Sequence, residues 1–214
     1  MTQTGIFQGR VQIPYAYGCY GYTRGGGKTW HGGIDLVGLD DDTIRMPCYT
    51  GADGVPRSVS GTVVTARIVT DKTNRTWEWG WYLCVQLDAN QTPDAVNYLY
   101  FCHCAGLLVR AGQKVKSGDA LAVMGNSGNA ALNDPPYKHC HLEVRAAATG
   151  QGLDPTAYSG TANAAGSYGS APAAEGRLQI ITIGPVSQGD ADAVLAACRA
   201  RGLDRQGLYT SRWA

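Results

Sequence analysis

The sequence has no apolar run of the length that crosses a membrane, and no basic region followed by an apolar stretch at its start. It therefore predicts neither a membrane span nor a secretory signal peptide. The formal net charge is only +1, so the chain lacks the basic field that attracts nucleic acid. Charged residues make up 16% and hydrophobic residues 44%, which is enough for an ordinary globular core.

A disulfide framework is also missing. The seven cysteines are an odd number, and a chain of 214 residues is long enough to fold without cross-links. We expect the cysteines to be mostly reduced, which predicts a protein made in a cytoplasm.

Helical periodicity is absent before residue 150. Short runs of alternating or β-branched residues recur there instead, and turn residues separate them. The runs cover residues 61–69, 81–87, 98–101, 120–124 and 141–144. This pattern predicts a mainly β domain, built as an antiparallel β-sheet or sandwich.

The composition changes after Tyr158. Residues 159–176 are mostly Ala, Gly, Ser, Thr, Asn and Pro, which bury too little apolar surface to order themselves, so they are interpreted as a linker. The sequence therefore predicts a main domain over 1–158 and a small C-terminal β-α-β module over 177–214. Within that module we expect strands at 178–183 and 208–210 and a helix at 190–201.

Only four histidines are present, and all lie in three short motifs. His31 and Asp35 form an H-x-x-x-D, His103 ends an aromatic run, and His139 and His141 form an H-x-H. Side chains alternate along a strand, so both histidines of the H-x-H would lie on one face. Two histidines and a carboxylate around an open position are typical of a catalytic zinc site, and two histidines remain to handle protons.

The cysteines beside these histidines allow a second metal hypothesis. Cys102, Cys104, Cys140 and a histidine would make a closed structural zinc site, although C-x-C spacing is tighter than the usual C-x-x-C loop. Strand alternation favours a packing role, because it points Cys140 into the core and places Cys102 and Cys104 on the face opposite His103.

Further motifs accompany the histidines in order along residues 30–158. They are Trp30 to Leu36 (WHGGIDL), Asp53-Gly54-Val55, Tyr100 to His103 (YFCH), Leu108 to Asp119 (LVRAGQKVKSGD), Met124 to Gly128 (MGNSG), His139 to Val144 (HCHLEV) and Leu153-Asp154-Pro155. With this set the chain resembles the lysostaphin-type (LytM-like) zinc endopeptidases, which cut the peptides of bacterial peptidoglycan.

The resemblance implies a role for each histidine motif. It makes His31, Asp35 and His141 the ligands of Zn²⁺, and it places the catalytic His103 and His139 beside the attacking water in a narrow groove. The sequence does not order the two proton-handling roles.

Other residues around these motifs have less definite roles. Glu143 is interpreted as a surface carboxylate or as a partner of a ligand. Asn126 and Ser127 are interpreted as turn formers. Residues 70–80, with Trp77 and Trp79, are expected to form a wall of the groove.

The resemblance also predicts the biological role. We expect a phage-type endolysin, made in the host cytoplasm and acting on the cell wall after lysis, whose C-terminal module targets the wall or drives self-association. The alternative is a non-catalytic peptidoglycan-binding or regulatory module that keeps its zinc site. The cleaved bond and the oligomeric state stay open.

Overall fold

The computed structural model describes residues 4–134, 136–170 and 187–200. The chain divides into two compact units, residues 1–173 and residues 174–214. The first unit holds all the described strands, and each unit is described here by itself.

The first unit consists of short strands joined by turns and short helices. The strands are β1 (Val11–Ile13), β2 (Gly21–Arg24), β3 (Thr29–His31), β4 (Ile34–Gly38), β5 (Thr43–Arg45), β6 (Cys48–Thr50), β7 (Pro56–Ser58), β8 (Ser60–Ile68), β9 (Trp81–Leu87), β10 (Tyr98–Leu107), β11 (Lys114–Lys116), β12 (Ala120–Met124), β13 (Cys140–Arg145), β14 (Gly152–Leu153) and β15 (Gly166–Tyr168). The helices are the 3₁₀ turns η1 (Ala16–Gly18), η2 (Arg75–Trp79) and η3 (Gly128–Leu132) and the short α1 (Thr156–Ser159).

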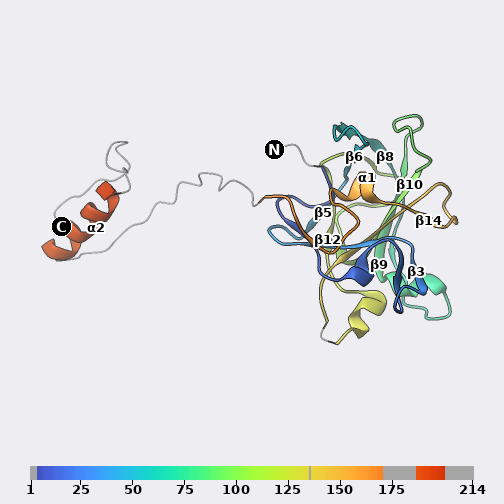
Figure 1. Cartoon of the computed structure of the whole chain (residues 1–214), viewed down its shortest axis with the longest axis horizontal. Coiled ribbons are helices and arrows are strands. Elements are labelled where there is room, and N and C mark those ends of the chain that lie inside the picture. Colours follow the sequence, from blue (N-terminus) through green and yellow to red (C-terminus); the bar gives the residue numbers. More distant parts are fainter. Residues whose placement is uncertain (1–3, 135, 171–186, 201–214) are drawn as a thin grey trace. The chain divides into compact units, whose positions relative to one another are not determined.

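One large antiparallel sheet organises this unit (Figure 1). Its strands run in the order β11-β8-β9-β10-β13-β4-β1-β15, while β12 pairs with β10 and β5, and β14 pairs with β13. Two small hairpins, β2-β3 and β6-β7, stand apart from it. The prediction of a mainly antiparallel β domain is confirmed, and all five alternating runs of the sequence are strands.

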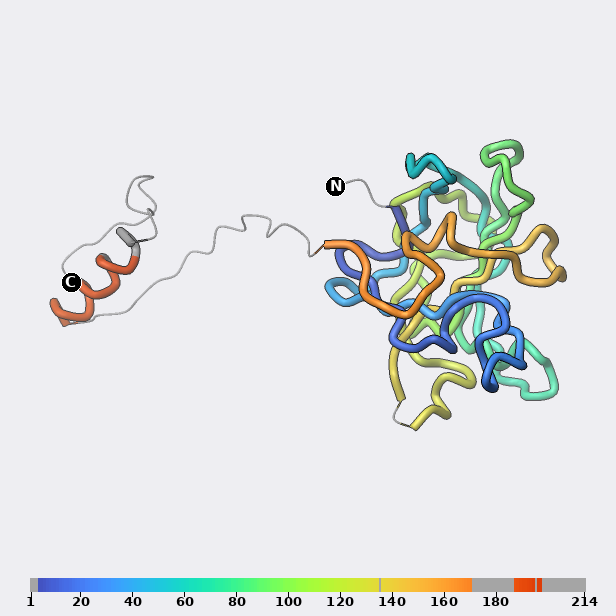
Figure 2. Tube along the Cα trace, viewed as in Figure 1, coloured from blue at the N-terminus to red at the C-terminus, as the bar shows by residue number. Residues whose placement is uncertain are grey.

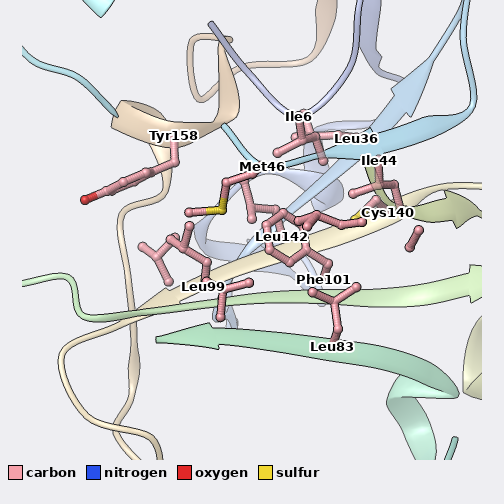
Figure 3. Close-up of a cluster of buried hydrophobic side chains, with 14 of the residues drawn as sticks. Ile6, Leu36, Ile44, Met46, Leu83, Leu99, Phe101, Cys140, Leu142 and Tyr158 are labelled. Atoms are coloured by element: carbon pink, nitrogen blue, oxygen red, sulfur yellow. The ribbon is translucent and has the colours of Figure 1, made fainter. Parts of the chain in front are cut away.

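Both faces of the central strands are covered. Along β10, Leu99 and Phe101 point into the main hydrophobic core, which Figure 3 shows between the sheet and the segment around Tyr158. Tyr100 and Cys102 point to the other face, where they form a smaller buried cluster with residues of β9. Strand β10 is therefore buried on both sides.

The predicted linker is wrong for residues 159–170, which are ordered parts of the first unit. Strand β15 adds to the edge of the sheet by pairing with β1, and the two segments run side by side in Figure 2. Ser159 and Thr161 are buried and hydrogen-bonded to each other, and Tyr168 packs against the core. Edge pairing uses backbone hydrogen bonds, so a composition of small residues does not prevent it.

In the second unit the structure describes one helix, α2 (Gln188–Ala200). It confirms the helix predicted from residue 190 onward, and Ser187 begins it by accepting a hydrogen bond from the backbone of Asp190. The strands predicted at 178–183 and 208–210 lie outside the described residues. No helix in the described part of the chain has the length and apolar character needed to cross a membrane.

Candidate metal centre

The register between β4 and β13 brings together residues that lie far apart in the sequence. Asp35 and His141 are direct cross-strand partners, so their side chains rise from the same face of the sheet. Nδ1 of His141 lies 3.0 Å from Oδ1 of Asp35. The neighbouring Cys140 alternates to the opposite face and enters the main core, as the H-x-H pattern predicts.

His31 reaches the same point from the end of β3. The two glycines after it turn the chain into β4, so that His31 and Asp35 converge without a helix. Gly33 makes this turn possible, because a Cβ at that position would lie 2.9 Å from Nε2 of His141 and would collide with the backbone carbonyl of Leu142. Only glycine lets the turn approach the His141 ring this closely.

The three side chains present a compact set of donor atoms. Nε2 of His31 lies 3.0 Å from Nδ1 of His141 and 3.3 Å from Oδ1 of Asp35, and the third separation is also 3.0 Å. A tetrahedral zinc ion with bonds of about 2.0 Å has donor atoms about 3.3 Å apart. The separations and the donor types therefore fit a zinc ion, and these residues form the candidate metal cluster among the described residues.

Hydrogen bonds on the far sides of the rings select the nitrogen that faces the centre. Nδ1 of His31 donates to the carbonyl of Cys19 at 2.8 Å, which leaves Nε2 unprotonated for a metal. Nε2 of His141 lies 3.5 Å from Oε2 of Glu143, which leaves Nδ1 for the same role. Oδ2 of Asp35 accepts a hydrogen bond from Arg24 at 2.9 Å, so Oδ1 is the oxygen turned to the centre.

Burial and charge set the protonation of these groups. Burial opposes ionisation of Asp35, but hydrogen bonds from His141 and His31 outweigh it and hold its pKa well below the usual value. Burial lowers the pKa of His141, whereas the carboxylates of Asp35 and Glu143 raise it, and the net result is a pKa of about 9. A metal ion must therefore displace a proton from His141.

A β-bulge brings His103 to the face that carries the candidate metal ligands. The pairing of β10 with β9 shifts between Phe101 and Cys104, and His103 has a left-handed φ of 63°. Regular alternation would place His103 with Phe101 on the core side, and the bulge re-aims it into the groove. The expectation for Cys102 is therefore wrong: it lies on the face of its cross-strand partner His141, while Cys104 packs in the core.

The turn predicted from Asn126 and Ser127 supports His103 directly. Nδ1 of His103 donates to the carbonyl of Ser127 at 2.9 Å, which leaves Nε2 free to accept a proton. The Ser127 hydroxyl donates to the carbonyl of Cys104 and accepts from the backbone of Trp81. Ser127 therefore holds the bulge and the ring in place, which is more than the turn-forming role expected for it.

His139 stands beside His103, with ring centroids 4.8 Å apart. Its Nε2 lies 3.9 Å from Oδ1 of Asp35, and Tyr137 stacks on its ring at 4.7 Å. Burial lowers the pKa of His139, and it lowers the pKa of His103 to about 3 with help from the neighbouring histidines. Both rings are therefore neutral at neutral pH and able to accept a proton.

These groups line one groove of about 350 Å³. Asp35, His103, His139 and His141 form its polar base. Its other lining residues are Tyr17, Arg24, Glu78, Trp79, Asn129, Ala130, Asn133 and Tyr137. The groove wall expected from residues 70–80 is present as η2, where Trp79 lines the groove, while Trp77 is not among the lining residues.

The cysteines do not form a competing metal cluster within the described residues. Cys102, Cys104 and Cys140 are fully buried free thiols, and Cys102 packs on a different face from the other two. Burial raises the pKa of each thiol, to about 12 for Cys104. They remain protonated and apolar, which is the packing role favoured from the sequence.

Several groove residues escape detection from sequence alone. Arg24 comes from the hairpin strand β2, Tyr17 from the short η1 and Tyr137 from a loop. No periodicity indicates which way a side chain points in such short or irregular segments. The spacing of Glu143 from His141 leaves open a surface carboxylate or a partner of a ligand, and the structure makes it a buried partner of that ring.

Comparison with known proteins gives one family match. Residues 43–155 match the model described as peptidase family M23. His103, His139 and His141 lie inside this segment, whereas His31 and Asp35 precede it. No curated protein matches the chain.

Solved structures give similarities of low sequence identity. The catalytic domain of the antimicrobial peptidase lysostaphin from Staphylococcus simulans is 19% identical, with 65% of this chain and 86% of that chain covered and a TM-score of 0.44. A mutant catalytic domain of the prophage-encoded M23 protein EnpA from Enterococcus faecalis is 20% identical, with 65% and 87% covered and a TM-score of 0.45. The SpoIIQ–SpoIIIAH pore-forming complex gives 16% identity, 74% and 90% coverage and a TM-score of 0.47.

Proposed function

The chain belongs to peptidase family M23, and from this premise we propose that it is a zinc-dependent endopeptidase that hydrolyses stem or cross-bridge peptides of bacterial peptidoglycan. The observation that carries the proposal is the convergence of His31, Asp35 and His141 with tetrahedral donor spacing, at a groove that Asp35 and His141 line. Two neutral histidines, His103 and His139, lie beside them.

Under this proposal His31 Nε2, Asp35 Oδ1 and His141 Nδ1 hold the zinc ion. A zinc ion held there supplies a Lewis acid that polarises the scissile carbonyl and acidifies a water. The surrounding chain fixes the ligands through the carbonyl of Cys19, the carboxylate of Glu143 and the guanidinium of Arg24. Such contacts orient the ligands and select their metal-binding atoms.

The two remaining histidines handle the protons. His139, whose Nε2 faces the ligand group, accepts the proton of the attacking water and later delivers one to the leaving amine. Nε2 of His103 carries no proton because Nδ1 donates to the carbonyl of Ser127, so it accepts a hydrogen bond from the attacking water beside His139. The two roles are exchangeable in this geometry.

We further propose a phage-type endolysin, made in the cytoplasm of an infected host and acting on the wall after lysis. The six described cysteines are free thiols, which supports synthesis in a reducing compartment. In this proposal the second unit targets the wall or drives self-association. Removing residues 171–214 would then reduce wall binding or change the oligomeric state, and an unchanged lysis rate, wall affinity and mass would reject this part.

The decisive test is digestion of purified peptidoglycans with different cross-bridges, followed by mass spectrometry of the released peptides. We expect new peptide amines that a chelator abolishes and that added zinc restores. The His141→Ala variant should lose both zinc and activity, whereas Cys104→Ala, which changes a buried thiol in the core, should keep both. A zinc-loaded chain that cleaves no wall would instead indicate a non-catalytic binding module.

A further inference from the structure

Arg24 places a cation at the mouth of the proposed reaction centre. It lies at the end of β2, lines the groove, and its side chain is 42% exposed. Among the lining residues of the described chain it is the only arginine or lysine. Its guanidinium contacts the candidate metal ligands but has more N–H donors than those contacts use.

The guanidinium is held on two of its three nitrogens. Nε donates to the carbonyl of Tyr17 at 3.3 Å, and Nη2 lies 2.9 Å from both Oδ2 of Asp35 and Nε2 of His31. Nη1 makes no hydrogen bond to any residue that the structure describes. Because the guanidinium is planar and rigid, fixing Nε and Nη2 also fixes the direction of the two N–H donors on Nη1.

The charged side chains of the groove confine a substrate carboxylate to the neighbourhood of Arg24. Glu78, on η2, lines the groove as an exposed carboxylate, and Asp35 is already paired with Arg24. A substrate carboxylate is therefore repelled by Glu78 and attracted by Arg24. A guanidinium binds a carboxylate through charge-assisted hydrogen bonds, which are about twice as strong as neutral ones.

From this geometry we infer that Arg24 binds a free carboxylate carried by the substrate beside the scissile bond, so that the groove selects anionic peptides over neutral ones. The inference rests on the proposed function and names the class of peptide that the site takes. In a D-alanyl–diaminopimelate cross-link, the carbon bearing the scissile nitrogen also bears a free carboxylate. In a glycine bridge the corresponding carbon continues into a neutral peptide bond.

The test compares two cross-linked peptides that differ in one group. One carries the free diaminopimelate carboxylate next to the scissile bond and the other carries its carboxamide. Their dissociation constants are measured by calorimetry on the zinc-loaded His139→Ala chain, which lacks the proposed base and leaves the peptides intact. We expect the carboxylate form to bind about tenfold more tightly or better.

Replacing Arg24 should remove this preference. In the His139→Ala background, Arg24→Gln should bring the ratio of the two dissociation constants to about one, and Arg24→Lys should keep part of it because the charge remains. Arg75→Gln makes the same change of charge on η2, away from Asp35, and should leave the ratio intact. Zinc content, measured on each variant, separates loss of the metal from loss of carboxylate binding.

The outcomes separate the inference from the function on which it rests. Equal binding of both peptides by the His139→Ala chain, or a preference that survives Arg24→Gln, overturns the role of Arg24. Hydrolysis of both peptides by the unsubstituted chain at equal kcat/KM also overturns it while supporting the peptidase. Preferential binding without hydrolysis by the unsubstituted zinc-loaded chain supports the role of Arg24 and rejects the proposed peptidase.

Discussion

Gly33 lies directly against the imidazole ring of His141, at a distance that no other residue type allows. A Cβ at this position would come within 2.8 Å of Cε1 and 2.9 Å of Nε2 of that ring. The turn between β3 and β4 therefore fixes the position of a residue on a third strand, β13.

Gly33→Ala is expected to displace the His141 ring. The added methyl group must also avoid the carbonyl of Leu142. We therefore expect stability to fall by about 1–3 kcal/mol and zinc affinity to fall by about 10–100-fold. Urea denaturation and competition with a chromophoric chelator measure the two effects. Gly106→Ala is the matched control, because a Cβ there meets open space. It should raise stability by about 0.5–1 kcal/mol and leave the zinc affinity unchanged.

His103 stores backbone strain that glycine would release. Since φ is 63°, His103→Gly should be about 1 kcal/mol more stable than His103→Ala, although both lose the imidazole. Both variants should lose about 10²–10⁴-fold in kcat. Chemical denaturation gives the stabilities. At the exposed Ala105 of the same strand glycine should instead be the less stable residue, and Ala105→Gly should cost about 0.5–1 kcal/mol in the free energy of unfolding. A His103→Gly variant that is less stable than His103→Ala would refute the backbone strain.

Zinc binding should depend on pH through His141. Its pKa of about 9 means that the ion displaces a proton, so affinity should rise about tenfold per pH unit up to about pH 9. The stability of the metal-free protein should instead fall as the pH rises. A raised histidine pKa stabilises the fold below the unfolded value of about 6.5, and that contribution is lost as the pH rises towards 9.

Glu143→Gln tests the origin of this pH dependence. Glu143 helps to raise the pKa of His141, so its amide should move the upper end of the zinc titration to lower pH. Glu78→Gln removes the same charge from the groove without a contact to His141 and should leave the titration in place. A zinc affinity that does not vary between pH 6.5 and 9 (roughly this window) would contradict the assignment.

The boundary of the first unit can be tested by truncation. A chain ending at residue 170 keeps β15 and its pairing with β1, and should be as stable as the whole chain. A chain ending at residue 158 loses this strand, the contact of Tyr168 with the core and the buried hydroxyl pair of Ser159 and Thr161. We expect it to be less stable by about 2 kcal/mol or more, measured by thermal denaturation. Equal stability of the two truncated chains would support the linker predicted from residue 159 onward.

Most strands of the fold could be predicted from the sequence because their side chains alternate regularly between two faces. The run over residues 120–124 is β12, and the H-x-H pattern correctly turns Cys140 into the core. The convergence of the three predicted ligands needed more than periodicity. What predicts it is that the three motifs use every histidine and follow the order found in the lysostaphin-type endopeptidases that the sequence resembles.

The parts that escaped prediction have physical reasons. The bulge at His103 breaks alternation without a glycine to mark it, so regular alternation predicts the wrong face for Cys102. Strand β15 pairs through its backbone, and composition does not report backbone pairing. Arg24 and Tyr137 reach the groove from a hairpin and a loop, where neither spacing nor composition fixes direction.

The cross-strand pairing of Asp35 with His141 also bears on how the chain reaches its folded state. These residues lie 106 positions apart, and a slip of one residue between β4 and β13 would turn them to opposite faces. An ion that needs both side chains lowers the free energy of the correct alignment alone. In the proposed zinc-bound state only correctly aligned chains gain binding free energy from the metal, so zinc would favour the correct register during sheet assembly.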